Sequence, residues 1–227
     1  MDPEVLNYVS VIFSGLINTI ILTFVGIAIG TALGAVLAFM EVMGPPSLSR
    51  VIGWVTRIIR GIPLLVILFL IFYGFPRLGI PLPPLPSAML GIGIRSGVYQ
   101  SQLFRGSMEA VGRGQLEAAF SIGLSKWGAF KHVILPQAVR LMIPGWVNEF
   151  TIVLKDTSIA YAIGVTEIFT EAVHVAQVVL DYLPPLLIVA AMYFTICYSV
   201  SHISDRLYRK FMIPGLGGSI EQGAENV

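Results

Sequence analysis

Two long runs without a charged side chain dominate the pattern of apolar and polar positions. One extends from Val5 to Met40 and the other from Tyr182 to Ser204. Each is longer than the roughly 20 apolar residues that cross a bilayer as an α-helix. Shorter apolar runs lie between them, separated by polar or proline-rich segments. The pattern predicts an all-α integral membrane protein with five transmembrane helices, at about residues 11–40, 51–75, 87–108, 137–163 and 183–208.

Proline and glycine predict where these helices bend or end. Gly44-Pro45-Pro46 should close the first span, and Pro63 should kink the second within its first half. The prolines of residues 76–86 predict a stiff, extended external loop. Pro144-Gly145 indicates a bend in the fourth span. A short helix is expected in the second external loop, residues 164–181.

The first span carries Gly26, Gly30 and Gly34 at four-residue spacing, which places them on one face. Small residues in such a stripe let another helix approach closely. The stripe is therefore expected to contact either another span of the same chain or a second subunit.

Composition agrees with a membrane protein, because only 12% of the residues are charged against about 25% in soluble domains. The net charge of +1 conceals an uneven distribution. Basic residues gather in residues 50–60, around residues 105–140 and after the last span, whereas only Arg77 falls in a loop on the opposite side. The acidic residues of that opposite side are Asp2, Glu4, Glu167, Glu171 and Asp181. The positive-inside rule then places the N-terminus outside and the C-terminus inside, and leaves no basic stripe for nucleic acid.

The two ends of the chain and its single cysteine indicate no processing and no disulfide. Asp2 and Glu4 stand where a signal peptide needs positive charge, so we expect no cleavage. Cys197 is the only cysteine, which forbids an internal disulfide. We expect one transmembrane domain, residues 1–213, and a flexible cytoplasmic tail, residues 214–227.

A polar insert at about residues 111–136 is the most informative segment. Leu116, Ala119, Phe120 and Gly123 follow the i, i+3, i+4, i+7 spacing of a short helix with one apolar stripe. Gly123 suits the left-handed residue that ends such a helix. Ser125 suits the cap of a second helix that continues to Pro136. The insert either rests on the membrane or on its own spans, or presents a surface to a cytoplasmic partner.

The insert and its surroundings resemble a known family. Glu117-Ala118-Ala119 is followed by Gly123 and, thirteen residues after that glycine, by Pro136 in Leu135-Pro136. This pattern is similar to the EAA loop of ABC-importer permeases, and the resemblance extends from about Gly15 to about Arg209. Flanking segments narrow it to permeases for polar amino acids: Arg60-Gly61-Ile62-Pro63, Ser96-Gly97-Val98-Tyr99, Phe104-Arg105-Gly106, Gly114-Gln115-Leu116, Val133-Ile134-Leu135-Pro136-Gln137-Ala138 and Lys155-Asp156-Thr157-Ser158.

The resemblance implies the transmembrane subunit of an ATP-driven importer of a polar amino acid in the cytoplasmic (inner) membrane. The implied partners are two ATPase subunits, an extracytoplasmic solute-binding protein and a second permease subunit, giving a homodimer or heterodimer. The insert would be the coupling helix that binds the ATPase, through Glu117, Ala118, Ala119, Gly123, Ser125, Leu135 and Pro136. Alternatives are a permease for a quaternary amine or an opine, and a non-transporting scaffold that recruits an ATPase.

No enzyme activity or cofactor is expected of this chain. The sequence has no Gly-x-x-x-x-Gly-Lys-Ser/Thr phosphate loop, so ATP hydrolysis is assigned to a separate subunit. No metal is expected, because no two of the three histidines have ligand spacing.

Ionisable residues fall inside the predicted spans. A charge at the bilayer centre costs about 2.5–3.5 kcal/mol on the mildest scale, so such residues pair or line a polar cavity. Arg95 and Glu149 both lie about 15 Å from the cytoplasmic end of their helices, at 1.5 Å per residue. They either form an ion pair that holds two helices together, or line a wet cavity for a zwitterionic solute. In that cavity Arg95 would meet a carboxylate, and Glu149 or Asp156 an ammonium group.

The resemblance favours the cavity, because the third and fourth spans supply the transport pathway in that family. The expected substrate-binding residues are Arg95, Tyr99, Gln102, Asn148, Glu149, Asp156, Thr157 and Ser158. Relatives often have Asn or a small residue where Arg95 stands, and Glu where Gln102 stands. These departures leave the identity of the amino acid open.

Overall fold

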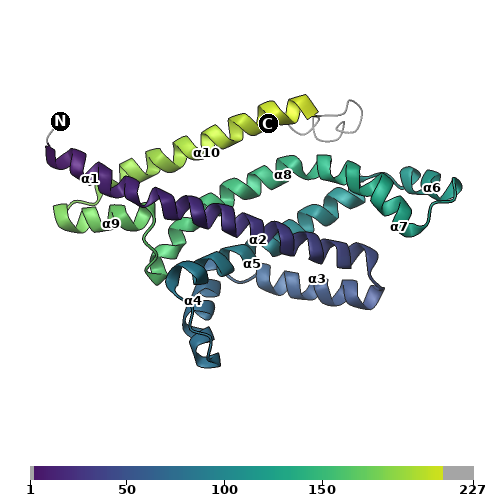
Figure 1. Cartoon of the computed structure of the whole chain (residues 1–227), viewed down its shortest axis with the longest axis horizontal. Coiled ribbons are helices and arrows are strands. Elements are labelled where there is room, and N and C mark those ends of the chain that lie inside the picture. Colours follow the sequence, from purple (N-terminus) through teal and green to yellow (C-terminus); the bar gives the residue numbers. More distant parts are fainter. Residues whose placement is uncertain (1–2, 212–227) are drawn as a thin grey trace.

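The structure is a computed structural model that describes residues 3–211, and every regular element in that range is helical. The helices α2, α5, α8 and α10 are the longest and form an elongated bundle (Figure 1). The central one, α5, packs against α2 and α8, and α8 in turn contacts α10. The prediction of an all-α protein is confirmed for the described residues, and residues 214–227 lie outside them. The four helices are α2 (Leu16–Met43), α5 (Pro84–Ala110), α8 (Leu135–Asp156) and α10 (Leu183–Phe211).

The glycine stripe of α2 is the surface that receives α5. Gly26, Gly30 and Gly34 are all buried. A methyl group at Gly30 would lie 2.8 Å from Ser96 and Gln100, and one at Gly34 would lie 2.9 Å from the carbonyl oxygen of Gly97. Of the two contacts considered for the stripe, the one within the chain is therefore confirmed.

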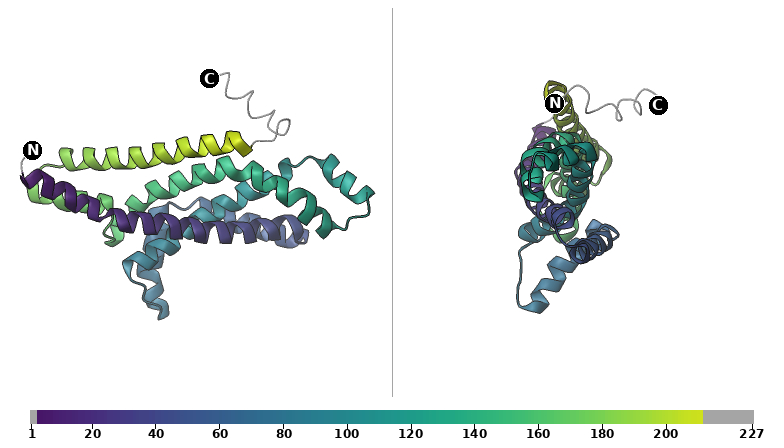
Figure 2. Two further views of the ribbon diagram at one scale, coloured as in Figure 1. Left: turned by 45° about the horizontal axis from the view of Figure 1, so that its top comes forward. Right: turned by 90° about the vertical axis from the view of Figure 1, so that its right-hand side faces the viewer.

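The second predicted span is broken rather than kinked. It consists of α3 (Pro46–Arg60) and α4 (Leu64–Gly74). The bend between Pro46–Arg60 and the segment Leu64–Leu78 is 96°. Pro63 has no N–H to donate and drives the residue before it out of the helical region, so the first helix ends at that point. α4 consequently projects away from the bundle (Figure 2). The expected single kinked helix is wrong for this segment.

The proline-rich connector is shorter and less extended than predicted. Phe75–Leu78 forms a 3₁₀ turn, η1, and α5 already begins at Pro84. Proline at the first turn of a helix loses no hydrogen bond, because the N–H there has no intrahelical acceptor. The prolines thus start the next helix as well as fill the loop.

The second helix of the insert does not end at Pro136. α7 (Lys126–Ala129) leads through a π-helical turn, η2 (Phe130–Ile134), directly into α8. Pro136 is the second residue of α8 and directly follows the π-helical turn. The helical path therefore shows no boundary between the insert and the predicted fourth span.

The end of the bundle at α1 is built from shorter helices. α8 continues into a 3₁₀ segment, η3 (Thr157–Ile163), and α9 (Ile168–Val179) follows. This α9 is the short helix expected in residues 164–181, and it packs against α1 (Pro3–Ser14) and α10. Ile12, Ile168 and Ala172 form the buried centre of this contact.

Two helices are long and apolar enough to cross a membrane by themselves, Tyr8–Met43 and Leu183–Ser204. Two bent pairs, α3 with α4 and the α7–η3 segment with α9, would raise the number in the described residues to four. α5, which corresponds to the third predicted span, falls outside that count; it carries Arg95, Arg105 and several serine and glutamine residues.

Candidate substrate site between the third and fourth predicted spans

Arg95 of α5 bridges two carboxylates of α8. Its Nη1 lies 2.6 Å from Oδ2 of Asp156 and 3.8 Å from Oε1 of Glu149. The two acids share a face of α8, because a spacing of seven residues is close to two turns. Sequence reasoning anticipated an Arg95–Glu149 pair, but the shorter contact is the one to Asp156. The exposed fractions of the side chains are 18% for Arg95, 9% for Glu149 and 17% for Asp156, so the cluster is shielded but not sealed.

Tyr99 completes the accessible side of this cluster. Its ring lies under the guanidinium of Arg95, with Cζ 4.7 Å from the ring centroid, and Arg60 approaches the same ring at 6.0 Å. An arginine over a tyrosine face is attracted by the negative charge density of the ring. Tyr99 thus holds the guanidinium in place while itself remaining partly exposed.

A hydrogen-bonded chain lies beside the cluster. The Ser96 hydroxyl accepts from Nε2 of Gln100 at 3.0 Å. Oε1 of Gln100 accepts from the Thr31 hydroxyl at 2.9 Å, which accepts from Nε1 of Trp146 at the same distance. Ser96 and Gln100 are fully buried. The chain joins α2, α5 and α8, and sequence reasoning missed it, although Ser96 and Gln100 share a helix face at i, i+4.

Gln102 lies outside the cluster of Arg95, Glu149 and Asp156. Its Nε2 donates to Oε2 of Glu41 at 3.3 Å, and its Oε1 accepts from Nη2 of Arg105 at 3.1 Å. Nε of Arg105 lies 3.4 Å from Oε1 of Glu41, and Nη1 lies 2.9 Å from Glu109. These residues tie the end of α2 to α5 beyond the Arg95 cluster. Gln102 is therefore not grouped with Arg95 as its sequence position suggested, and Glu41 was not anticipated.

The remaining residues expected to bind substrate point elsewhere. Asn148 is exposed. The Ser158 hydroxyl donates to the carbonyl of Lys155 at 2.8 Å. The Thr157 hydroxyl donates to the carbonyl of Leu154 at 2.7 Å and lies 3.1 Å from the hydroxyl of Tyr193 on α10. The structure thus brings together Arg95, Tyr99, Glu149 and Asp156 only.

A buried carboxylate at the start of α9 was also missed. Glu167 is fully buried and caps α9: its Oε1 accepts from the N–H of Thr170 at 2.7 Å and its Oε2 from the N–H of Phe169 at 2.9 Å. A carboxylate at this position offsets the unpaired N–H groups and the positive end of the helix. The sequence signal was an acidic residue directly before a short apolar helix.

The start of the insert, from α6 to Ser125, has the local structure that its sequence predicts. α6 (Arg113–Ser121) is followed by Gly123 in the left-handed conformation, with φ of +83°. Oγ of Ser125 then accepts from the N–H of Gly128 at 3.2 Å. Ala119 is buried and Leu116 packs against the cluster of Val111, Phe130, Ile134 and Ala138.

The opposite side of the insert is open. Glu117 and Ala118 are exposed, and Ile122 and Trp127 leave 78% and 54% of their surface uncovered. Leu135 and Pro136 are exposed as well. Leu116 and Ala119 of the predicted stripe therefore rest on the chain's own helices, whereas Phe120 and Gly123 are exposed. Ile122 and Trp127 are presented outward together with the polar face of the insert.

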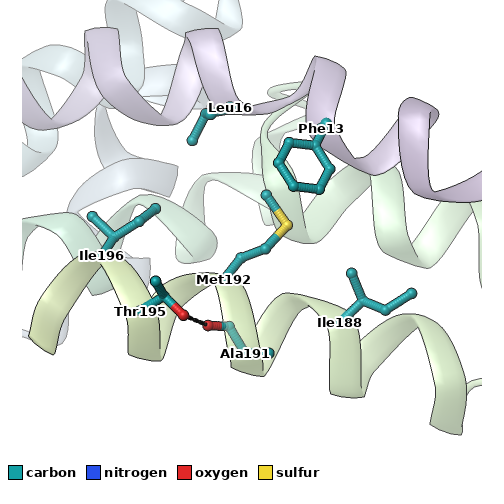
Figure 3. Close-up of a pocket in the computed structure, with 7 residues that line it drawn as sticks. All are labelled: Phe13, Leu16, Ile188, Ala191, Met192, Thr195 and Ile196. Carbon is teal, nitrogen blue, oxygen red and sulfur yellow. Dashed lines mark hydrogen bonds between the residues drawn. The ribbon is translucent and has the colours of Figure 1, made fainter. Parts of the chain in front are cut away.

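A groove of about 380 Å³ between α1 and α10 is a poor site for a polar solute. Its only polar side chain is Thr195, whose hydroxyl donates to the carbonyl of Ala191 at 2.7 Å (Figure 3). A zwitterion there would lose its hydration without gaining partners. The groove is lined by Phe13, Leu16, Ile188, Ala191, Met192, Thr195 and Ile196.

The chain is similar to known proteins in sequence and in fold. Residues 30–213 match the family described as binding-protein-dependent transport system inner membrane component. The L-cystine transport system permease protein TcyB of Bacillus subtilis (strain 168) is 38% identical over 182 residues, which cover 78% of each chain. The arginine transport system permease protein ArtQ of the same organism is 28% identical and covers 88% of this chain and 91% of its own.

Solved structures show the same likeness. A chain in the crystal structure of an amino acid ABC transporter with histidines superposes with a TM-score of 0.86 and 32% identity, covering 92% of this chain and 97% of its own. The MetNI methionine ABC transporter in an inward-facing conformation shares the fold at 16% identity, with a TM-score of 0.81 and coverage of 94% and 100%.

Proposed function

The chain belongs to the family of binding-protein-dependent transport system inner membrane components, and from this premise we propose that a polar amino acid crosses the membrane past the Arg95–Glu149–Asp156 cluster. The chain is an amino-acid ABC transporter permease, a membrane subunit that is not itself catalytic. Hydrolysis of ATP takes place on a separate subunit in such systems.

The observation that carries the proposal is the ion cluster between α5 and α8. A scaffold that merely recruits an ATPase needs no ionised side chains in its interior, where each is costly. Here Nη1 of Arg95 lies within 4 Å of a carboxylate oxygen of both Glu149 and Asp156, and the side chains remain partly open. Their two signs match the carboxylate and the ammonium group of an amino acid, which would bind with Arg95 and with Glu149 or Asp156 respectively.

The topology of the chain and its partners in the transporter are proposed from the same premise. The chain crosses the cytoplasmic membrane five times, with the N-terminus outside and the C-terminus inside. A second permease subunit completes the pathway, and a solute-binding protein delivers the amino acid on the outer side. The outward face of the insert, with Glu117, Ile122 and Trp127, binds the ATPase. ATP-driven movement of the ATPases then switches the cluster between the two sides.

Uptake by reconstituted vesicles tests the transport role. Vesicles that contain the chain, its ATPase and its binding protein should accumulate a polar amino acid only with ATP on the cytoplasmic side. Asp156→Asn should lower the initial rate by about tenfold or more, because it removes one charge of a buried pair. Ser199→Ala is the matched control, since that hydroxyl is exposed and bonds only its own helix, at the carbonyl of Thr195. Equal rates for Asp156→Asn and wild type would contradict transport past the cluster.

A further inference from the structure

The formal charges of the cluster do not cancel. Arg95 contributes one positive charge, and Glu149 and Asp156 contribute one negative charge each, so one negative charge is left over. The next basic residue along α8, Lys155, is exposed. Arg95 is therefore the cation that lies between the two acids, and it occupies the space that a cationic ligand would otherwise take.

The geometry leaves Arg95 able to bind a solute while it holds both acids. Both ion pairs end on Nη1. The donors on Nε and Nη2 form the other edge of the guanidinium, and that edge suits a bidentate contact with a carboxylate. Tyr99 stacks on one face and keeps the group oriented.

The leftover charge then limits what the solute can carry. An amino acid places its carboxylate against the free edge of Arg95, and its ammonium group takes up the one uncompensated negative charge. A second positive charge, on a lysine or arginine side chain, would meet Arg95 in a shielded environment where like charges repel strongly. No acid of the cluster remains to receive it.

We propose that Arg95 is a resident counter-cation that sets the specificity of this permease, admitting amino acids with an uncharged side chain and excluding those with a cationic one. This inference rests on the proposed function, since it assigns a selectivity to the same site. Removal of Arg95 exposes two carboxylates, one for the ammonium group and one for a cationic side chain. The variant should therefore acquire the ligands that the wild type rejects.

Direct binding to the purified permease–ATPase complex tests this, without the binding protein, which imposes a selectivity of its own. The probes are L-lysine and a panel of uncharged amino acids that includes L-glutamine. Wild type should bind a member of the panel at least about tenfold more tightly than lysine, a difference that corresponds to about 1.4 kcal/mol. Arg95→Gln should bind lysine about tenfold more tightly than wild type does, and the panel more weakly.

Three further variants separate this role from a structural one. Arg95→Lys keeps the charge and should still exclude lysine. Lys155→Gln removes an exposed charge that directly precedes Asp156, and it should raise the affinity for lysine less than Arg95→Gln does. Asp156→Asn, which brings the formal charge of the cluster to zero, should bind lysine more weakly still. If Arg95→Gln is too unstable to purify alone, lysine in the extraction buffer should rescue its yield, and glutamine should not.

The outcomes distinguish the two proposals. If wild type binds lysine as tightly as the best uncharged amino acid, or if Arg95→Gln gains no affinity for lysine and no yield from it, the counter-cation role is overturned while transport stands. If no amino acid binds wild type and none is taken up by vesicles, the proposed function itself fails.

Discussion

The hydroxyl of Tyr193 on α10 donates a 3.0 Å hydrogen bond to the buried carboxylate of Glu167, the residue that caps α9. The same hydroxyl lies 3.1 Å from that of Thr157, the residue directly after Asp156. One phenol therefore connects the cap of α9, the helix α10 and the first residue after the site-bearing helix α8. A bond to a buried carboxylate is worth more than an ordinary one, because an unpaired charge there keeps its full desolvation cost.

Tyr193→Phe should lower the thermal unfolding temperature of the purified protein, because it removes a donor from Glu167 at a cost of about 1–3 kcal/mol. Tyr198→Phe is the control, since Tyr198 lies on the same helix with 60% of its surface exposed. The double change Glu167→Gln with Tyr193→Phe should lower the free energy of unfolding by less than the sum of the two single changes. Strict additivity would show that the two groups do not interact.

Gly30→Ala should destabilise the contact between α2 and α5. The added methyl group would lie 2.8 Å from both Ser96 and Gln100, which are held by hydrogen bonds and cannot easily move. Overpacking of this kind costs about 1–3 kcal/mol. Gly106→Ala on α5 has open space around it and should be neutral or slightly stabilising. Thermal unfolding in detergent compares the two, and an unchanged midpoint for Gly30→Ala would contradict the packing argument.

Glu117→Ala should reduce co-purification of the ATPase and coupled uptake without loss of the permease from the membrane. The side chain is exposed, so its removal affects a partner rather than the fold. Gln115→Ala, exposed on the same helix, is the control. Undiminished association together with normal uptake in Glu117→Ala would contradict a docking role for this residue.

Gly123→Ala should disturb the turn between α6 and α7. Its φ of +83° is a conformation that costs an L-residue about 1–2 kcal/mol. Gly114→Ala lies within α6 with open space around it and should not share this effect. We expect faster proteolysis of the insert in Gly123→Ala and weaker ATPase association. Equal protease sensitivity of the two variants would show that the turn tolerates the change.

Thiol labelling can test the membrane orientation. In a Cys197→Ser background, Leu78→Cys should react with an impermeant maleimide on intact cells, and Ile122→Cys only after permeabilisation. Both side chains are well exposed, at 74% and 78%, so access depends on the side of the membrane. Labelling of Ile122→Cys on intact cells would reverse the proposed orientation.

Several features of the protein were determined by the sequence alone, because they depend on neighbours along the chain. The composition and the uncharged runs predicted helices throughout the described residues. Gly123 and Ser125 produced the turn and the cap expected of them, since a left-handed residue and an N-cap are local requirements. The insert also carried the resemblance that the comparisons with known proteins confirmed.

The arrangement of charges was decided only by the tertiary structure. Helical periodicity placed Glu149 and Asp156 on one face of α8, but the axial shift between α5 and α8 selected Asp156 as the closer partner of Arg95. The rotation and shift of the helices relative to one another also place Gln102 beside Glu41, which lies sixty-one residues earlier in the sequence. Pro63 predicted a bend, but the size of the bend, 96°, depends on the surfaces against which the two helical segments pack. Periodicity fixes the direction of a side chain on its own helix, whereas rotation and register between helices arise from packing of the whole bundle.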